Sequence, residues 1–118
     1  MAVHNEIGKQ GEELAVNWLM EKGWQILERN WRFSYAEIDI IAIYENKLHF
    51  IEVKTRTSVK YGLPEDSVTP AKFRHVKKAA SVYIRKFPQI KWIQFDIVSI
   101  ILIENKKPAF YLIQDIYL

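Results

Sequence analysis

The sequence contains no cysteine, and it has only four glycines and four prolines among its 118 residues. The absence of cysteine excludes a disulfide scaffold and any zinc site that is built on thiolates. The glycines and prolines are scattered, and no repeat, linker or low-complexity tract divides the chain. We therefore expect one compact domain over residues 1–118, because domains typically have about 100–200 residues.

Long apolar runs are also missing. The longest one, from Ile97 to Ile103, is interrupted by Ser99, whereas a membrane-spanning helix needs about 20 apolar residues. The first residues, MAVHNEIGKQGEE, lack the apolar segment of a secretory signal. The sequence therefore predicts a cytoplasmic protein without a membrane span. With 49% hydrophobic and 14% aromatic residues, the chain still has enough material for a buried core.

Charge is distributed unevenly along the chain. Residues 1–54 contain six basic and nine acidic side chains, whereas residues 55–118 contain eleven basic and five acidic side chains. Between Asp66 and Asp96 there are seven lysines or arginines and no carboxylate. The acidic half could hold a cation, and the basic half could attract a polyanion such as nucleic acid. An ordinary solvated surface is the alternative that charge alone leaves open.

Helix start and stop signals occur at two places. Asn5 can cap a first helix that Gly23 ends, and Thr69 followed by Pro70 can start a second one. The expected order is a helix over residues 5–22, strands over 24–30, 35–44 and 48–56, a loop over 57–67, a helix over 69–87, and strands over 90–103 and 109–117. This order, α-β-β-β-α-β-β, predicts an α/β fold with a mixed central sheet that is flanked by helices.

Two acidic residues are predicted to face each other across a hairpin. A two-residue turn at Glu45 and Asn46 would pair residues whose numbers add up to 91. Asp39 would then lie directly opposite Glu52, with Cβ atoms about 4.5–5.5 Å apart. Because strand side chains alternate between faces, Lys54 would share the face of Glu52. The residues expected on the face of Asp39 are Glu37, Ile41 and Ile43.

Opposed carboxylates repel each other unless a positive charge lies between them. Mg²⁺ prefers oxygen ligands and keeps several waters, so Asp39 and Glu52 would suffice as its protein ligands, with Mn²⁺ as a substitute. Such an ion can polarise a phosphoryl oxygen and lower the pKa of a bound water. Lys54 could hold the attacking water or stabilise the pentavalent phosphorane. An exposed ion pair is the alternative, because Glu-x-Lys is common in strands.

The second predicted helix carries a basic face. Arg74, Lys78 and Arg85 project within about 40° of one another at about 100° per residue, and Lys77 flanks them. This face could follow a phosphate backbone. A solvated helix face is the alternative, which the sequence leaves open.

Other candidates lie in loops and among the aromatic residues. Lys60 and Tyr61 in the predicted loop could contact a nucleic acid. Trp31 and Tyr35 could stack on unpaired bases, but core packing is the expectation for both. The three histidines, His4, His49 and His75, lack the spacing of a metal-binding pair, and we expect structural or surface roles for them.

Short motifs follow one another over residues 8 to about 100. They are Gly8-Lys9-Gln10-Gly11-Glu12 with Ala15, Leu27-Glu28-Arg29-Asn30-Trp31-Arg32, Glu37-Ile38-Asp39-Ile40-Ile41, Phe50-Ile51-Glu52-Val53-Lys54-Thr55-Arg56, Val68-Thr69 with Lys72 and Arg74, and Ala80 followed by Phe95-Asp96-Ile97-Val98. In this order they resemble the YraN-like family, whose motifs include GxxGExxA, GEIDLI and FVEVKTR. These small bacterial proteins are predicted endonucleases of the PD-(D/E)XK nuclease superfamily.

The resemblance implies a restriction-endonuclease-like core and a role for each matching residue. Asp39 and Glu52 would be metal ligands, Lys54 would be the catalytic lysine, and Glu12 would complete the acidic site as a third metal ligand. Helical spacing agrees, because it places Glu12 on the rim of the apolar stripe of its helix and Glu13 toward solvent. Resolvase-like relatives act as dimers, so a homodimer is expected by analogy.

The sequence thus predicts a Mg²⁺-dependent endonuclease that cleaves DNA, with branched or structured DNA as one expected substrate. The residues predicted to contact nucleic acid are Arg56, Lys60, Lys72, Arg74, Lys77, Lys78 and Arg85. Two alternatives stay open: a non-catalytic nucleic-acid-binding module on the same fold, and a protein-interaction domain with a basic helix face. The chain departs from the family pattern at Ala36, where glycine is usual, and at Gln94, where arginine is usual.

Overall fold

A computed structural model describes residues 2–57 and 68–116 of the chain. The elements are α1 (Ala2–Glu21), β1 (Gln25–Phe33), β2 (Ala36–Tyr44), β3 (Lys47–Arg56), α2 (Pro70–Tyr83), the short 3₁₀ helix η2 (Ile84–Lys86), β4 (Ile93–Ile101) and β5 (Ala109–Ile113). Their order confirms the predicted sequence of helices and strands. None of the helices in the described ranges is long and apolar enough to cross a membrane.

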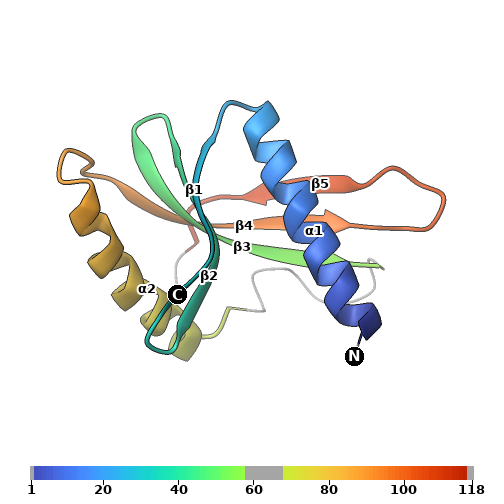
Figure 1. Cartoon of the computed structure of the whole chain (residues 1–118), viewed down its shortest axis with the longest axis horizontal. Coiled ribbons are helices and arrows are strands. Elements are labelled where there is room, and N and C mark those ends of the chain that lie inside the picture. Colours follow the sequence, from blue (N-terminus) through green and yellow to red (C-terminus); the bar gives the residue numbers. More distant parts are fainter. Residues whose placement is uncertain (1, 58–67, 117–118) are drawn as a thin grey trace.

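The five strands form one mixed sheet in the order β1-β2-β3-β4-β5. β3 and β4 are parallel and the other neighbours are antiparallel, so the connection through α2 is the crossover that a parallel pair requires. The two helices lie on opposite faces of the sheet (Figure 1). Ile40 and Ala42 of β2 pack in the cluster of α1, whereas Ile41 packs in the cluster of α2. This arrangement is consistent with a nuclease-like fold.

The turn between β2 and β3 has the predicted length of two residues. Glu45 and Asn46 have φ angles of 49° and 62°, as a tight turn that follows the strand twist requires. Tyr44 pairs with Lys47, and Ile40 pairs with Ile51. The predicted register is therefore confirmed over this part of the hairpin.

β1 is longer than predicted. Asn30 was expected to end the strand, and it does adopt a left-handed φ of 52°. The strand nevertheless continues to Phe33, because Trp31 and Phe33 pack against the buried cluster on the α2 side of the sheet. Tertiary packing thus overrides the turn preference of asparagine.

The second helix begins as predicted and ends earlier. Thr69 caps it, since its side chain accepts a hydrogen bond from the backbone N–H of Lys72, and Pro70 is the first helical residue. The α-helix ends at Tyr83 rather than at Phe87 and is followed by the 3₁₀ turn of η2. Phe87 itself leaves the helical conformation, which is disfavoured for a residue before proline. β4 starts at residue 93 and β5 ends at residue 113, both within the longer predicted segments.

Candidate active site

The candidate site lies where β2 and β3 separate. Their backbone pairing ends at Ile40 and Ile51, and beyond this point β2 bends toward α2 while β3 continues beside β4 (Figure 1). Because the two strands separate, some backbone groups of β3 have no partner on β2. Asp39 provides an acceptor for one of them: its Oδ2 accepts a hydrogen bond of 2.8 Å from the backbone N–H of Val53. The aspartate is thus fixed at the fork of the hairpin.

The predicted cross-strand pair of Asp39 and Glu52 is not part of the ladder, which stops one pair earlier. The predicted alternation along β2 is also wrong at this point. Ile38 packs in the same cluster as Ile41, although strict alternation would place them on opposite faces. Asn30, which has a left-handed φ, lies in β1 between the residues that pair with Ile38 and Ile40. The local twist of both strands therefore breaks the alternation.

Four carboxylates converge at this fork. Burial raises the pKa of Asp39 from 3.8 to about 6, although the hydrogen bond from Val53 acts in the opposite direction. Repulsion by Glu12, Glu52 and Glu37 raises the pKa further. Burying a carboxylate among like charges is unfavourable, so this arrangement is typical of a site that binds a cation or a proton.

Glu12 reaches the fork because α1 packs very closely on β3. A Cβ atom at Gly11 would lie only 1.8 Å from Oγ1 of Thr55, so only glycine permits this approach. Glu12 is partly buried beside this contact, as the helical spacing predicts. Glu13 is exposed and forms a salt bridge of 2.9 Å with Arg29 of β1. The two adjacent glutamates therefore have different surroundings.

Two lysines belong to the same region. Lys72 at the start of α2 forms an ion pair with Glu52, whose side chain is 24% exposed. Lys72 is one of the residues predicted to contact nucleic acid, and in the structure its side chain pairs with Glu52. Lys54 follows Glu52 by two residues on β3, pairs with Ser99 of β4 and is partly buried. Lys72 therefore contacts one of the carboxylates directly, and Lys54 lies on the strand that carries Glu52.

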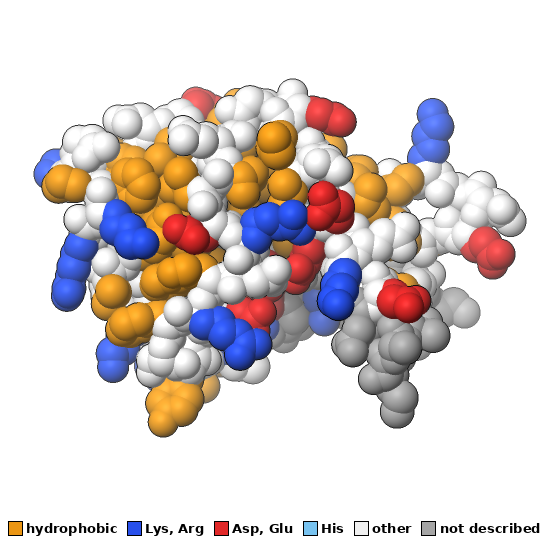
Figure 2. Space-filling model, in the orientation of Figure 1, with side chains coloured by type: hydrophobic (Ala, Val, Ile, Leu, Met, Phe, Trp, Pro, Cys, Tyr) orange, Lys and Arg blue, Asp and Glu red, His pale blue; other side chains and the backbone are white. Residues whose placement is uncertain are grey.

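These groups border an open cleft of about 420 Å³. It is lined by Tyr35, Ala36, Glu37, Asp39, Glu52, Lys72, His75 and Val76. A narrower apolar recess beside it, between α2 and the sheet, includes Phe73 and Phe95. Figure 2 shows that acidic and basic side chains lie side by side on the face of the molecule that it draws. The cleft thus combines a charged floor with apolar walls, as small-molecule and substrate sites do.

Comparison with known proteins places this arrangement in a family. The uncharacterised protein family UPF0102 matches residues 11–100. The chain belongs to this family. It is similar to UPF0102 proteins of Phocaeicola vulgatus (44% identity) and Flavobacterium psychrophilum (46%), with 94% of this chain covered in both cases and 97% and 98% of the relatives. A third UPF0102 protein, from Syntrophomonas wolfei, is 41% identical over 94% of this chain and 97% of its own length.

The carboxylates of this UPF0102 member fit a cation that needs few protein ligands. Within residues 2–57 and 68–116, no three acidic or histidine side chains are close enough together to hold one metal ion. A preassembled ligand set of Glu12, Asp39 and Glu52 is therefore not present. Mg²⁺ is commonly bound by one or two carboxylates together with waters and substrate phosphates, and Asp39 and Glu52 fit that requirement.

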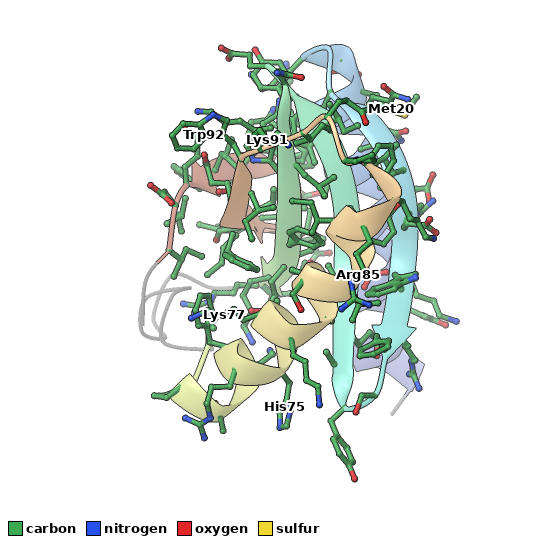
Figure 3. The ribbon with its side chains drawn as sticks, turned by 90° about the vertical axis from the view of Figure 1, so that its left-hand side faces the viewer. Met20, His75, Lys77, Arg85, Lys91 and Trp92 are labelled. Atoms are coloured by element: carbon green, nitrogen blue, oxygen red, sulfur yellow. The ribbon has the colours of Figure 1, made fainter. Side chains whose placement is uncertain are left out.

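The remaining predicted nucleic-acid contacts lie mainly on α2. Arg74, Lys77 and Lys78 are exposed, and Arg85 is exposed in η2. Figure 3 shows His75, Lys77 and Arg85 along this helical segment. A 3₁₀ turn advances about 120° per residue instead of about 100°, so Arg85 is rotated by about 40° from its predicted α-helical position and stays near the face of Arg74 and Lys78. We call Arg74, Lys78 and Arg85 the basic stripe.

The other two predicted contacts are Arg56 and Lys60. Arg56 ends β3, is partly buried, and accepts a backbone hydrogen bond of 2.7 Å from Leu102. It is not among the residues that line the cleft. Lys60, like Tyr61, falls outside the described residues.

Sequence reasoning missed two features of the site. Tyr35 is 86% exposed, so the expectation of core packing is wrong for it, whereas Trp31 is in the core as predicted. The signal was its position in the tight turn between β1 and β2. The other missed feature is the partner of His49: the histidine is buried, in the structural role expected for it, with its Nδ1 2.7 Å from Oδ2 of Asp96. Gln94 also donates a hydrogen bond of 3.0 Å to Asp96.

Proposed function

We propose that this UPF0102 protein is a metal-dependent endonuclease that hydrolyses DNA phosphodiester bonds in the Asp39–Glu52 cleft. The observation that supports this proposal most directly is the partly buried Asp39: burial raises its pKa to about 6, and repulsion by three further carboxylates acts in the same direction. Within the described part of the chain, its one hydrogen-bond donor is a neutral backbone N–H. A binding module would gain nothing from carboxylates that repel phosphate, whereas a hydrolytic site needs them.

Asp39 and Glu52 would hold Mg²⁺, with Mn²⁺ as a substitute. When bound, the ion would supply Lewis-acid polarisation of the scissile phosphate and a lower pKa for a neighbouring water. The fold already holds both carboxylates in place: the backbone of Val53 fixes Asp39, and Lys72 pairs with Glu52. Glu12 would act on the same centre without being a direct ligand, by adding negative charge that favours a cation.

Lys54 would stabilise negative charge on the phosphoryl group during the reaction. An ammonium is a compact positive charge, and its partly buried position on β3 would strengthen its effect. If so, Lys54→Ala abolishes cleavage and leaves DNA affinity within a few-fold of wild type. Arginine would rescue poorly, because its planar fork does not replace a compact ammonium.

The basic stripe would bind the phosphate backbone outside the cleft. Its side chains are exposed, and α2 carries His75 and Lys72 on the cleft side. Contacts to phosphates fix the position of DNA without reading its sequence. The polynucleotide would therefore be held by α2 while one phosphate lies near the carboxylates. A DNA substrate agrees with the expected cytoplasmic location, and the homodimer stays a proposal by analogy.

A cleavage panel tests the proposal. Linear duplex, single strand, flap and four-way junction are incubated with Mg²⁺, Mn²⁺ or EDTA, and products are resolved on gels. We expect metal-dependent cleavage that Asp39→Asn and Glu52→Gln each abolish. Glu13→Gln is the matched control, because Glu13 is exposed and paired with Arg29. Calorimetric titration with Mn²⁺ should show binding that the Asp39→Asn, Glu52→Gln double variant lacks.

The outcomes separate the alternatives. Cleavage that survives the double variant would overturn the site assignment. Binding of DNA without cleavage under any metal would favour the non-catalytic nucleic-acid-binding module. Neither binding nor cleavage would favour the protein-interaction domain, whose basic helix face would then bind an acidic partner.

A further inference from the structure

An aromatic side chain projects into solvent at the rim of the cleft. Tyr35 lies in the turn between β1 and β2 and is 86% exposed. Its ring centroid is 5.5 Å from that of His75 on α2, and the two rings are inclined by 56°. Both residues line the cleft that contains Asp39 and Glu52. The rings therefore come from two separate elements that meet beside the carboxylates.

We propose that the ring of Tyr35, with the inclined ring of His75 beside it, is a stacking platform for one unpaired nucleobase of the substrate. The inference rests on the proposed function and deepens it by naming the substrate class. Within a duplex both faces of a base are covered by its neighbours, so a protein ring can stack only on a base that has left the helix. The preferred substrate is then single-stranded or locally unpaired nucleic acid.

The position of the platform relative to the carboxylates supports this occupant. A nucleotide joins a base to a phosphate, and the cleft offers an aromatic rim beside a floor of Asp39 and Glu52. Its volume of about 420 Å³ lies within the range of about 300–1,000 Å³ that is usual for small-ligand sites. Stacking is tolerant of sequence because every base has a π-face. The platform would thus place a phosphate without selecting a base.

Other exposed aromatic side chains lack this placement. Trp92 is 67% exposed just before β4, and Tyr111 is 54% exposed on β5. Neither residue borders the cleft. In contrast, Trp31 and Phe33, which flank the same turn, are stacked on each other and belong to the core cluster. Tyr35 is therefore not a continuation of the core, and Tyr111 offers a matched control.

Binding measurements without hydrolysis test the platform. Fluorescence anisotropy with a labelled 20-nucleotide single strand and with the matching blunt duplex is recorded in EDTA for wild type, Tyr35→Ala, Tyr35→Phe and Tyr111→Ala. Loss of one stacked base should weaken single-strand binding by about 5- to 100-fold in Tyr35→Ala. Tyr35→Phe keeps the ring and should retain the affinity. Duplex affinity should stay constant, and Tyr111→Ala should resemble wild type with both ligands.

Several results would overturn the platform. One is a single-strand affinity in Tyr35→Ala that equals that of wild type, and another is an equal loss for single strand and duplex. A wild-type protein that binds no single strand overturns it as well. Because Tyr35 is highly exposed, its substitution should leave the melting temperature unchanged, and a melt checks this.

Different results would refute the proposed stacking platform and the proposed nuclease activity. Metal-dependent cleavage at an unchanged rate in Tyr35→Ala, with unchanged single-strand binding, would refute the platform alone. Single-strand binding that depends on Tyr35, in a protein that cleaves nothing with any metal, would refute the nuclease and leave the platform. A 2-aminopurine base in the single strand gives a second readout, since its fluorescence is quenched when it stacks.

Discussion

Replacing Asp39 by asparagine should make the metal-free protein more stable at neutral pH. The carboxylate is partly buried, and Glu12, Glu52 and Glu37 repel it, so its ionised form is unfavourable in the folded state. Asparagine has nearly the same shape and no charge. Its side-chain oxygen can still accept the hydrogen bond from the backbone of Val53, which fixes the residue at the fork.

The size of the effect follows from the pKa of Asp39, which rises from 3.8 to about 6 on folding. At about 1.36 kcal/mol per pKa unit, this difference corresponds to up to about 3 kcal/mol. The folded state binds the proton more tightly than the unfolded state does. The free energy of unfolding therefore falls as the pH rises from about 3.8 to about 6, and the penalty is complete above that range.

Urea unfolding followed by circular dichroism at pH 4, 5, 6 and 7.5, in EDTA, measures this difference. At pH 7.5, Asp39→Asn should exceed wild type by about 1–3 kcal/mol, and the two proteins should converge near pH 4. Glu13→Gln is the control, and its difference from wild type should stay within about 0.5 kcal/mol at every pH. Adding Mg²⁺ should then stabilise wild type and not Asp39→Asn, because only wild type would bind the ion.

The reasoning fails if Asp39→Asn is less stable than wild type at pH 7.5. It also fails if the difference between the two proteins does not change with pH. The first result would mean that the hydrogen bond from Val53 stabilises the ionised carboxylate by more than burial destabilises it. The second would mean that Asp39 has an ordinary pKa and that the carboxylates do not interact.

Three further predictions concern the helices. Gly11→Ala should destabilise the fold by about 1–3 kcal/mol, because the new Cβ would collide with Thr55. Gly8→Ala should stabilise it by up to about 1 kcal/mol, because no atom lies within 4 Å of the new Cβ. Thermal melts of the two variants measure both effects. Glu12→Gln should lose metal-dependent cleavage with the fold intact, and equal activity in Glu12→Gln and Glu13→Gln would contradict the placement of α1. Neutralising the basic stripe should weaken DNA binding for all sequences and lower the log–log salt slope by about 0.9 per lost contact on duplex DNA. An unchanged slope would make the stripe an ordinary solvated surface.

The hairpin shows what the sequence could predict. The turn residues Glu45 and Asn46 set the register, and the isoleucine pattern of β2 identified a buried strand. Glu12 was placed correctly by helical spacing, because α1 is regular and its apolar stripe faces the sheet. The positions of side chains on regular helices and strands can therefore be predicted from the sequence alone.

The remaining parts of the site depend on tertiary structure. The bond from Val53 to Asp39 exists because β2 and β3 separate, and no local pattern marks where a strand pair ends. The ion pair of Lys72 with Glu52 depends on how α2 packs against β2. Tyr35 is exposed because no element in the described part of the chain covers the turn between β1 and β2.

The same irregularity explains why the site is where it is. When two strands separate, a backbone N–H of the continuing strand needs another acceptor, and the carboxylate of Asp39 provides it at 2.8 Å. That bond uses Oδ2, and within the described part of the chain Oδ1 has no hydrogen-bond partner. One short side chain can thus complete the sheet and present an oxygen to the cleft. A fully paired hairpin would leave no room beside Glu52 for the substrate that we propose, so the unpaired fork would exchange some stability for function.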